Sequence, residues 1–159
     1  MPIVTQQLTR RAALRLAALA GVAHAVPAFA AALPKVVMHK DPFCGCCGKW
    51  AEHLKRAGFV VETVEQKDMQ AIKGRFGVPD DLASCHTAEM AGYIIEGHVP
   101  APALLRLLET RPDAIGLAAP GMPAGSPGME GLIAEVFDVI QFGKTGRSTF
   151  GRYKGATQV

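Results

Sequence analysis

The sequence predicts an α/β fold in which helices flank a mixed, partly parallel central sheet, with a long proline- and glycine-rich loop. Three observations predict it. Short segments with the composition of strands take turns along the chain with segments whose apolar residues recur at helical spacing. Glycines and prolines separate these segments. Their order, in which each strand is followed by a helix, is typical of helices packed against a sheet with parallel strands.

The first 30 residues have the order of a signal peptide. Arg10 and Arg11 precede an uncharged run over 16–26, which is followed by Ala-Phe-Ala at 28–30. The arginine pair favours twin-arginine export over the general secretory route, with cleavage after Ala30. The run is well short of the roughly 20 residues that span a bilayer. We therefore predict a periplasmic protein whose mature chain, 31–159, is one domain without a membrane span.

The charge of the mature chain excludes some partners. The whole chain has 17 basic and 14 acidic residues, but three of the basic ones, Arg10, Arg11 and Arg15, lie in the predicted signal peptide (17 − 3 = 14). The mature chain is therefore neutral by this count. It has no basic field that would attract nucleic acid or anionic lipid.

The mature chain opens with a predicted strand and helix that enclose a cysteine-rich loop. The run 35–40 is rich in β-branched residues and ends at Asp41-Pro42, because proline cannot donate a hydrogen bond to a sheet. From Cys47 onwards, apolar residues recur at helical spacing as far as Gly58, a stop signal. We therefore expect a helix that begins at Cys47.

The following elements alternate in the same way. We predict a strand over 59–64, a helix over 69–76, a strand over 91–96, a helix over 102–110 and a late strand over 135–142. The helix over 69–76 is closed by glycine and proline directly after it. Together with the first pair, these segments complete the predicted sheet and its helices.

Two segments lack a regular pattern. The stretch 116–131 holds three prolines, five glycines and two methionines, which predicts a long loop and neither helix nor strand. The tail after Phe142 is rich in glycine and cationic residues, and we expect it to be peripheral.

All four cysteines, Cys44, Cys46, Cys47 and Cys85, belong to the mature chain. An exported protein lies in an oxidising compartment, so structural disulfides are one interpretation. A bridge within 44–47 would close a very short loop and remove little entropy from the unfolded chain. Only a bridge to Cys85 would stabilise the fold much.

Redox catalysis is a second interpretation. Cys44 and Cys47 have C-x-x-C spacing after a strand and at a helix start, where the helix dipole favours the thiolate. This placement is typical of a thiol–disulfide oxidoreductase. Cys46 argues against it, because a third thiol would compete for mixed disulfides.

Metal binding is the third interpretation and the one we favour. Thiolates at a helix start select soft ions, Cu(I) above all, with zinc as the main competitor. Adjacent Cys46 and Cys47 cannot easily chelate one tetrahedral ion, whereas a thiolate can bridge two ions. The spacing therefore predicts a multi-copper cluster, and a metal-binding protein more than an enzyme; an enzyme with this site would be an oxidoreductase.

Three further side chains are candidate ligands. His86 is adjacent to Cys85, and His98 follows the predicted third strand, from where it could line the site. Met122 lies in the proline- and glycine-rich loop, and its thioether suits Cu(I). The predicted metal ligands are therefore Cys44, Cys46, Cys47, Cys85, His86, His98 and Met122.

Several separate motifs occur together in one order. They are Lys-Asp-Pro-Phe-Cys-Gly-Cys-Cys at 40–47, Ser-Cys-His-Thr at 84–87, Glu-Gly-His-Val-Pro at 96–100, and the Pro-Gly-Met stretch at 120–130. On these motifs the chain resembles the CopG-type periplasmic copper-resistance proteins over most of its mature length. The resemblance implies a thioredoxin-like fold with an extra loop over the site.

The resemblance also implies a function. It assigns Cys44, Cys46, Cys47 and Cys85 as ligands of a thiolate-bridged multi-copper centre. The protein would hold copper as a store, a relay or a Cu(I)/Cu(II) redox centre that limits toxicity. Its partners would be copper ions and other periplasmic copper-handling proteins.

Overall fold

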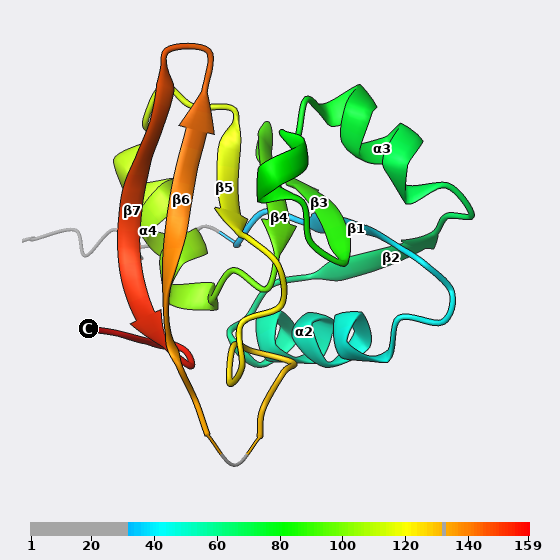
Figure 1. Ribbon diagram of the computed structural model, residues 1–159, viewed down its shortest axis with the longest axis horizontal. Coiled ribbons are helices and arrows are strands. Elements are labelled where there is room, and N and C mark those ends of the chain that lie inside the picture. Colours follow the sequence, from blue (N-terminus) through cyan, green and yellow to red (C-terminus); the bar gives the residue numbers. More distant parts are fainter. Residues whose placement is uncertain (1–31, 132) are drawn as a thin grey trace, which may run out of the picture. The chain divides into compact units, whose positions relative to one another are not determined.

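The computed structural model describes residues 32–131 and 133–159, and the predicted signal peptide lies outside them. Their centre is a mixed eight-stranded sheet in the spatial order β2-β1-β3-β4-β5-β6-β7-β8 (Figure 1). β1 is parallel to β2 and β4 to β5, and the other neighbouring strands are antiparallel. The strands are β1 Val36–Lys40, β2 Val61–Glu65, β3 His86–Met90, β4 Tyr93–Gly97, β5 Gly116–Ala119, β6 Val136–Gly143, β7 Gly146–Lys154 and β8 Thr157–Gln158.

This architecture confirms the predicted α/β fold with a mixed sheet. The helices are α2 Gly45–Arg56, α3 Met69–Phe76 and α4 Ala101–Thr110. None of the helices in the described part of the chain has the length and apolar character needed to cross a membrane. The likeness to thioredoxin that the resemblance implies stays a prediction.

α2 begins at Gly45 and not at Cys47 as predicted. The reason is a tight turn after β1, in which the Cys44 amide donates to the Asp41 carbonyl at 3.0 Å and Cys44 becomes the N-cap. The predicted apolar face is confirmed, because Cys47, Trp50, Ala51 and Leu54 are all buried. The turn therefore places all three clustered cysteines at the first turn of the helix.

α3 has the predicted bounds because both of its ends carry strong signals. Asp68 Oδ1 accepts a hydrogen bond from the Ala71 amide at 2.9 Å, which caps the first turn. Gly77 closes the helix in the left-handed conformation, with φ 68°.

The sheet has a core on each face. Successive residues of a strand point to opposite faces. Ile95 of β4 therefore joins the main core with Trp50 and Leu104, beneath α2 and α4. Its neighbour Ile94 joins a smaller core with Phe142 and residues that follow α3. Figure 1 shows α2 and α3 on opposite sides of the strands β1 and β3.

The strand predicted over 91–96 is confirmed as β4, and it forms a hairpin with β3, a strand that was not predicted. β3 and β4 pair with each other around Ala91 and Gly92, which both have positive φ. β3 escaped prediction because it carries buried polar residues such as His86 and Thr87, so it shows no polar–apolar alternation.

The stretch 116–131 is not entirely loop. Its first four residues form β5, which is fully buried between β4 and β6. A Cβ on Gly116 would lie 1.7 Å from the Ile94 carbonyl oxygen. This glycine therefore marks a close approach of two strands and not a break in the sheet. The loop itself runs from Pro120, after β5, towards β6.

The tail after Phe142 is part of the sheet, and the prediction that it is peripheral is wrong. β6 and β7 form an antiparallel hairpin, and Phe150 and Tyr153 of β7 are buried in the main core. Most other positions of β7 are exposed, so the strand lacks the apolar pattern on which the prediction relied.

Candidate metal centre

The loop between β1 and α2 is held by a lysine at the end of β1. Lys40 Nζ donates to the carbonyl oxygens of Asp41 at 2.8 Å and Pro42 at 3.1 Å. Asp41 Oδ1 in turn accepts from the Phe43 amide at 2.8 Å. These bonds fix the turn that brings Cys44 to the start of α2.

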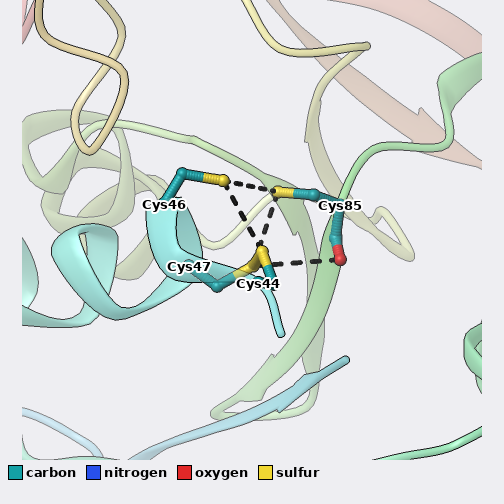
Figure 2. A group of neighbouring side chains, drawn as sticks. All are labelled: Cys44, Cys46, Cys47 and Cys85. Atoms are coloured by element: carbon teal, nitrogen blue, oxygen red, sulfur yellow. Dashed lines mark hydrogen bonds between the residues drawn. A yellow bond between two sulfur atoms is a disulfide. The ribbon is translucent and has the colours of Figure 1, made fainter. Parts of the chain in front are cut away.

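The four cysteine sulfurs converge, as Figure 2 shows. Cys46 Sγ lies 3.5 Å from Cys44 Sγ and 3.8 Å from Cys85 Sγ. Cys85, which directly precedes β3, also approaches Cys47, with 3.6 Å between the two sulfurs. The four sulfurs therefore form one compact group, in which Cys46 contacts both Cys44 and Cys85.

Two of the cysteines are covalently joined. Cys44 and Cys47 form a disulfide, whereas Cys46 and Cys85 are free. The pairing has C-x-x-C spacing and leaves Cys85 unbridged, so it is not the long-range structural bridge considered from the sequence. All four sulfurs become available as ligands only after this disulfide is reduced.

His98 follows β4 and is fully buried beside Cys85. Its Nδ1 lies 2.6 Å from the carbonyl oxygen of Pro127, which can only accept, so Nδ1 carries the proton and donates. The unprotonated Nε2 lies 3.0 Å from Cys85 Sγ. Burial lowers the pKa of His98. The imidazole is therefore neutral and presents a lone pair to the cysteines, as a metal ligand requires.

His86 is also fully buried, at the start of β3. Its Nδ1 lies 3.3 Å from Cys85 Sγ, and its ring packs against Trp50 with 4.3 Å between ring centroids. Its Nε2 is buried without a hydrogen-bond partner among the described residues. Burial holds the pKa of His86 well below its usual range, and nearby His98 and Lys73 act in the same direction. His86 is therefore a second neutral imidazole at the site.

The donor atoms form two sets that share Cys85. One set is the four cysteines, and the other is Cys85 with His86 and His98; within each set the ligand atoms lie within 4.8 Å of one another. Sulfur and imidazole donors are those that soft and borderline metal ions prefer. The residues present therefore fit a site for such ions.

Cys85 is protonated in the metal-free protein at neutral pH. Burial, together with the neighbouring Cys46, raises the pKa of the Cys85 thiol to about 12. A metal ion that binds this sulfur must therefore displace a proton.

The long loop packs against the site. Pro127 accepts from His98, and a Cβ on the next residue, Gly128, would lie 2.7 Å from the Cys46 carbonyl oxygen. Only glycine allows so close an approach. Met122 of the same loop differs from the other six candidates, because its side chain is 55% exposed whereas theirs are buried or half-buried. Its role as a ligand stays a prediction.

The structure also reveals two buried charged residues next to the Cys85-His86 segment, which the sequence did not indicate. Lys73 of α3 and Glu96 of β4 form an ion pair with 2.5 Å between Lys73 Nζ and Glu96 Oε1. The two residues are 23 positions apart, and although Glu96 opens the Glu-Gly-His-Val-Pro motif at 96–100, that motif does not reveal a contact with Lys73.

The fold and the site define an α/β protein that gathers four cysteines and two histidines in the manner of a soft-metal site. A family model described as "Protein of unknown function, DUF411" matches residues 82–129. No curated protein sequence matches the chain.

Two solved structures match over most of the chain. One is "Copper resistance protein copG- Form 1", which is 43% identical, with a TM-score of 0.72, over 77% of this chain and 99% of that chain. The other is "Copper resistance protein copG- Form 2", which is 43% identical, with a TM-score of 0.73, over 76% of this chain and 98% of that chain. The chain belongs to the family of copper resistance protein copG.

Proposed function

We propose that the mature chain is a periplasmic copper-binding protein of copper resistance and homeostasis. It holds Cu(I) in a thiolate-bridged cluster of Cys44, Cys46, Cys47 and Cys85. The observation that carries this proposal is that Cys46 Sγ contacts the sulfurs of both Cys44 and Cys85 within one compact group of four sulfurs, because a thiolate with two sulfur neighbours can share a copper ion with each of them. The names of the two structural relatives support copper as the ion.

The donor chemistry supports copper over zinc. Cu(I) prefers thiolates, and a thiolate can bridge two copper ions, so one set of four sulfurs can hold more than one ion. His86 and His98 would bind at the Cys85 side of this set, where both nitrogens approach the sulfur. A structural zinc site would instead use four donors for a single ion.

The Cys44–Cys47 disulfide links copper loading to reduction. It takes up two electrons and two protons to give two thiols, and only then can both sulfurs bind copper. We include in the proposal a Cu(I)/Cu(II) redox role for the loaded site, which would limit copper toxicity. The electrons for the disulfide come from a reductant outside the chain.

We expect copper loading to depend on reduction. Protein isolated without reductant and then unfolded in denaturant should react with a thiol reagent at two positions, Cys46 and Cys85, and reduced protein at four. Anaerobic titration with Cu(I) should then give more than one equivalent per chain, with thiolate-to-copper absorption, only after reduction. Titration that stops at one equivalent or less in fully reduced protein would contradict the cluster.

A thiol–disulfide oxidoreductase is the second candidate function. The observation in its favour is the Cys44–Cys47 disulfide at the start of α2, where a helix N-terminus stabilises a thiolate. Insulin reduction by the metal-free protein distinguishes the two functions. The copper-binding proposal expects little activity, whereas an oxidoreductase would lose its activity on Cys44→Ser or Cys47→Ser and keep it on Cys46→Ser.

Export is part of the proposal. The Arg10-Arg11 pair and the Ala-Phe-Ala sequence at 28–30 predict a mature protein that begins at or near Ala31, in the periplasm with other copper-handling proteins. Intact-mass measurement of the periplasmic fraction checks this. Uncleaved protein in the membrane fraction would refute it, and Arg10→Lys with Arg11→Lys should block export if the twin-arginine route is used.

A further inference from the structure

The segment that carries Cys85 and His86 is tied to a buried carboxylate. Glu96 of β4 is fully buried and accepts three hydrogen bonds. Its Oε1 accepts from the Ser84 amide at 2.6 Å and from Lys73 Nζ at 2.5 Å. Its Oε2 accepts from Thr87 Oγ1 at 2.6 Å. Ser84 and Thr87 directly flank Cys85-His86, so a single side chain holds both ends of the candidate ligand pair.

The carboxylate reaches this segment from the face of the sheet opposite α2. Thr87 and Glu96 are paired across β3 and β4, and Lys73 of α3 contacts both of them, with 3.1 Å from its Nζ to Thr87 Oγ1. His86, next to Thr87, points to the other face and packs against Trp50 of α2. Glu96 therefore acts on the cysteine cluster through the backbone of Ser84 and the side chain of Thr87.

The buried Lys73–Glu96 ion pair restricts the geometry of this region more than it stabilises the fold. A buried ion pair gains little over apolar side chains of the same size, because both charges lose their hydration. It does restrict geometry, since each donor must meet a particular oxygen. The carboxylate of Glu96 is bonded to Ser84 and Thr87 on the two sides of Cys85-His86, and to Lys73. This indicates that the ion pair fixes the position of the Cys85-His86 segment.

We infer that Glu96 is a positioning residue of the metal site, with Lys73 as its counter-charge. Glu96 holds Cys85 and His86 in place, so that Cys85 faces Cys46 and Cys47. The inference rests on the proposed copper-binding function. Glu96 does not itself bind the metal, because its oxygens are occupied by Ser84, Thr87 and Lys73. Its contribution is to fix the one cysteine that comes from outside the 44–47 cluster.

Two double variants, in each of which Lys73 and Glu96 are both replaced, test the inference without leaving a buried charge unpaired. Lys73→Met with Glu96→Leu removes the charges and every acceptor, whereas Lys73→Met with Glu96→Gln removes the charges and keeps an oxygen for the Ser84 amide. In reduced, metal-free protein we expect amide hydrogen exchange at Cys85 and His86 to be at least tenfold faster in the Leu variant than in the wild type. The Gln variant should lie between them, and amides of β6 serve as the reference for global unfolding.

Copper binding gives the second readout. The Leu variant should retain fewer Cu(I) equivalents against a competing chelator than the Gln variant, with altered thiolate-to-copper absorption. Equal hydrogen exchange in the two double variants, or equal copper retention and spectra, would overturn the positioning role. If the Leu variant does not fold, Thr87→Val decides, since it removes one anchor with little change of shape: faster exchange at Cys85 and His86 supports the role, and unchanged exchange refutes it.

Failure of the proposed function would look different. A wild-type protein that binds one copper ion or none would refute the cluster proposal. The exchange measurement needs no metal, and therefore tests the positioning role separately. Faster exchange at Cys85 in the Leu variant would still show that Glu96 holds the segment in place.

Discussion

Cys85→Ser should reduce Cu(I) binding to at most one equivalent per chain while the fold stays intact. Cys85 Sγ is the meeting point of the two donor sets, with Cys47 Sγ at 3.6 Å on one side and His98 Nε2 at 3.0 Å on the other. A serine hydroxyl is a hard donor and cannot bridge Cu(I), so both sets lose their shared ligand. Anaerobic titration against a chelator of known affinity measures the loss, and circular dichroism checks the fold.

The control for Cys85→Ser is a variant that loses buried packing at a position away from the candidate ligands. Val139→Ala removes buried volume from β6 without touching any candidate ligand. It should lower the melting temperature and leave the copper stoichiometry at the wild-type value. Wild-type stoichiometry in Cys85→Ser would mean that Cys85 is not a ligand and that the cluster is confined to residues 44–47.

Cys85 should also make copper affinity depend on pH. Since its pKa is raised to about 12, the thiol carries its proton throughout the neutral range and releases it when copper binds. The apparent affinity should therefore rise with pH, by about tenfold per unit for this one proton, and fall as the solution becomes more acidic. The pH dependence should be shallower in Cys85→Ser, which has no such proton to release.

Elements with strong local signals were predictable from the sequence. α3 has its predicted bounds because Asp68 caps one end and Gly77 closes the other. The start of α2 was misplaced, because the turn at Asp41 that sets it depends on backbone hydrogen bonds that no spacing reveals. Gly116 led to the wrong prediction of a loop. Glycine is common in loops, but here it permits a close contact between two strands.

Buried polar residues explain the strand that was missed. Thr87 of β3 is fully buried because its hydroxyl donates to Glu96 of β4 and accepts from Lys73 of α3. A pattern of apolar and polar residues cannot show such partners, so β3 did not register as a strand. The convergence of the cysteines was predictable, since three are clustered and Cys85 lies near the next strand. The disulfide was not settled, because four cysteines offer six possible pairs for a single disulfide, of which the C-x-x-C pair Cys44 and Cys47 was one candidate.

Cys46→Ser should lower the copper stoichiometry by more than one equivalent. Cys46 Sγ lies within 3.8 Å of the sulfurs of both Cys44 and Cys85, and each bridging thiolate ties the occupancy of one ion to that of its neighbour. Removing one bridge therefore releases more than one ion, and the remaining sites should fill without cooperativity. Titration of reduced protein, followed by thiolate-to-copper absorption, measures both effects.

The same substitution separates the copper cluster from its rivals. Cys46 takes no part in the Cys44–Cys47 disulfide, so an oxidoreductase would keep its activity in Cys46→Ser. A zinc site would hold one ion per chain, and removal of that ion would partly unfold the protein. Only a bridged cluster loses several ions from one substitution while the fold persists. If Cys46→Ser binds as much copper as the wild type, and the wild type binds one equivalent or less, the cluster is wrong and disulfide chemistry at Cys44 and Cys47 becomes the better account of the site.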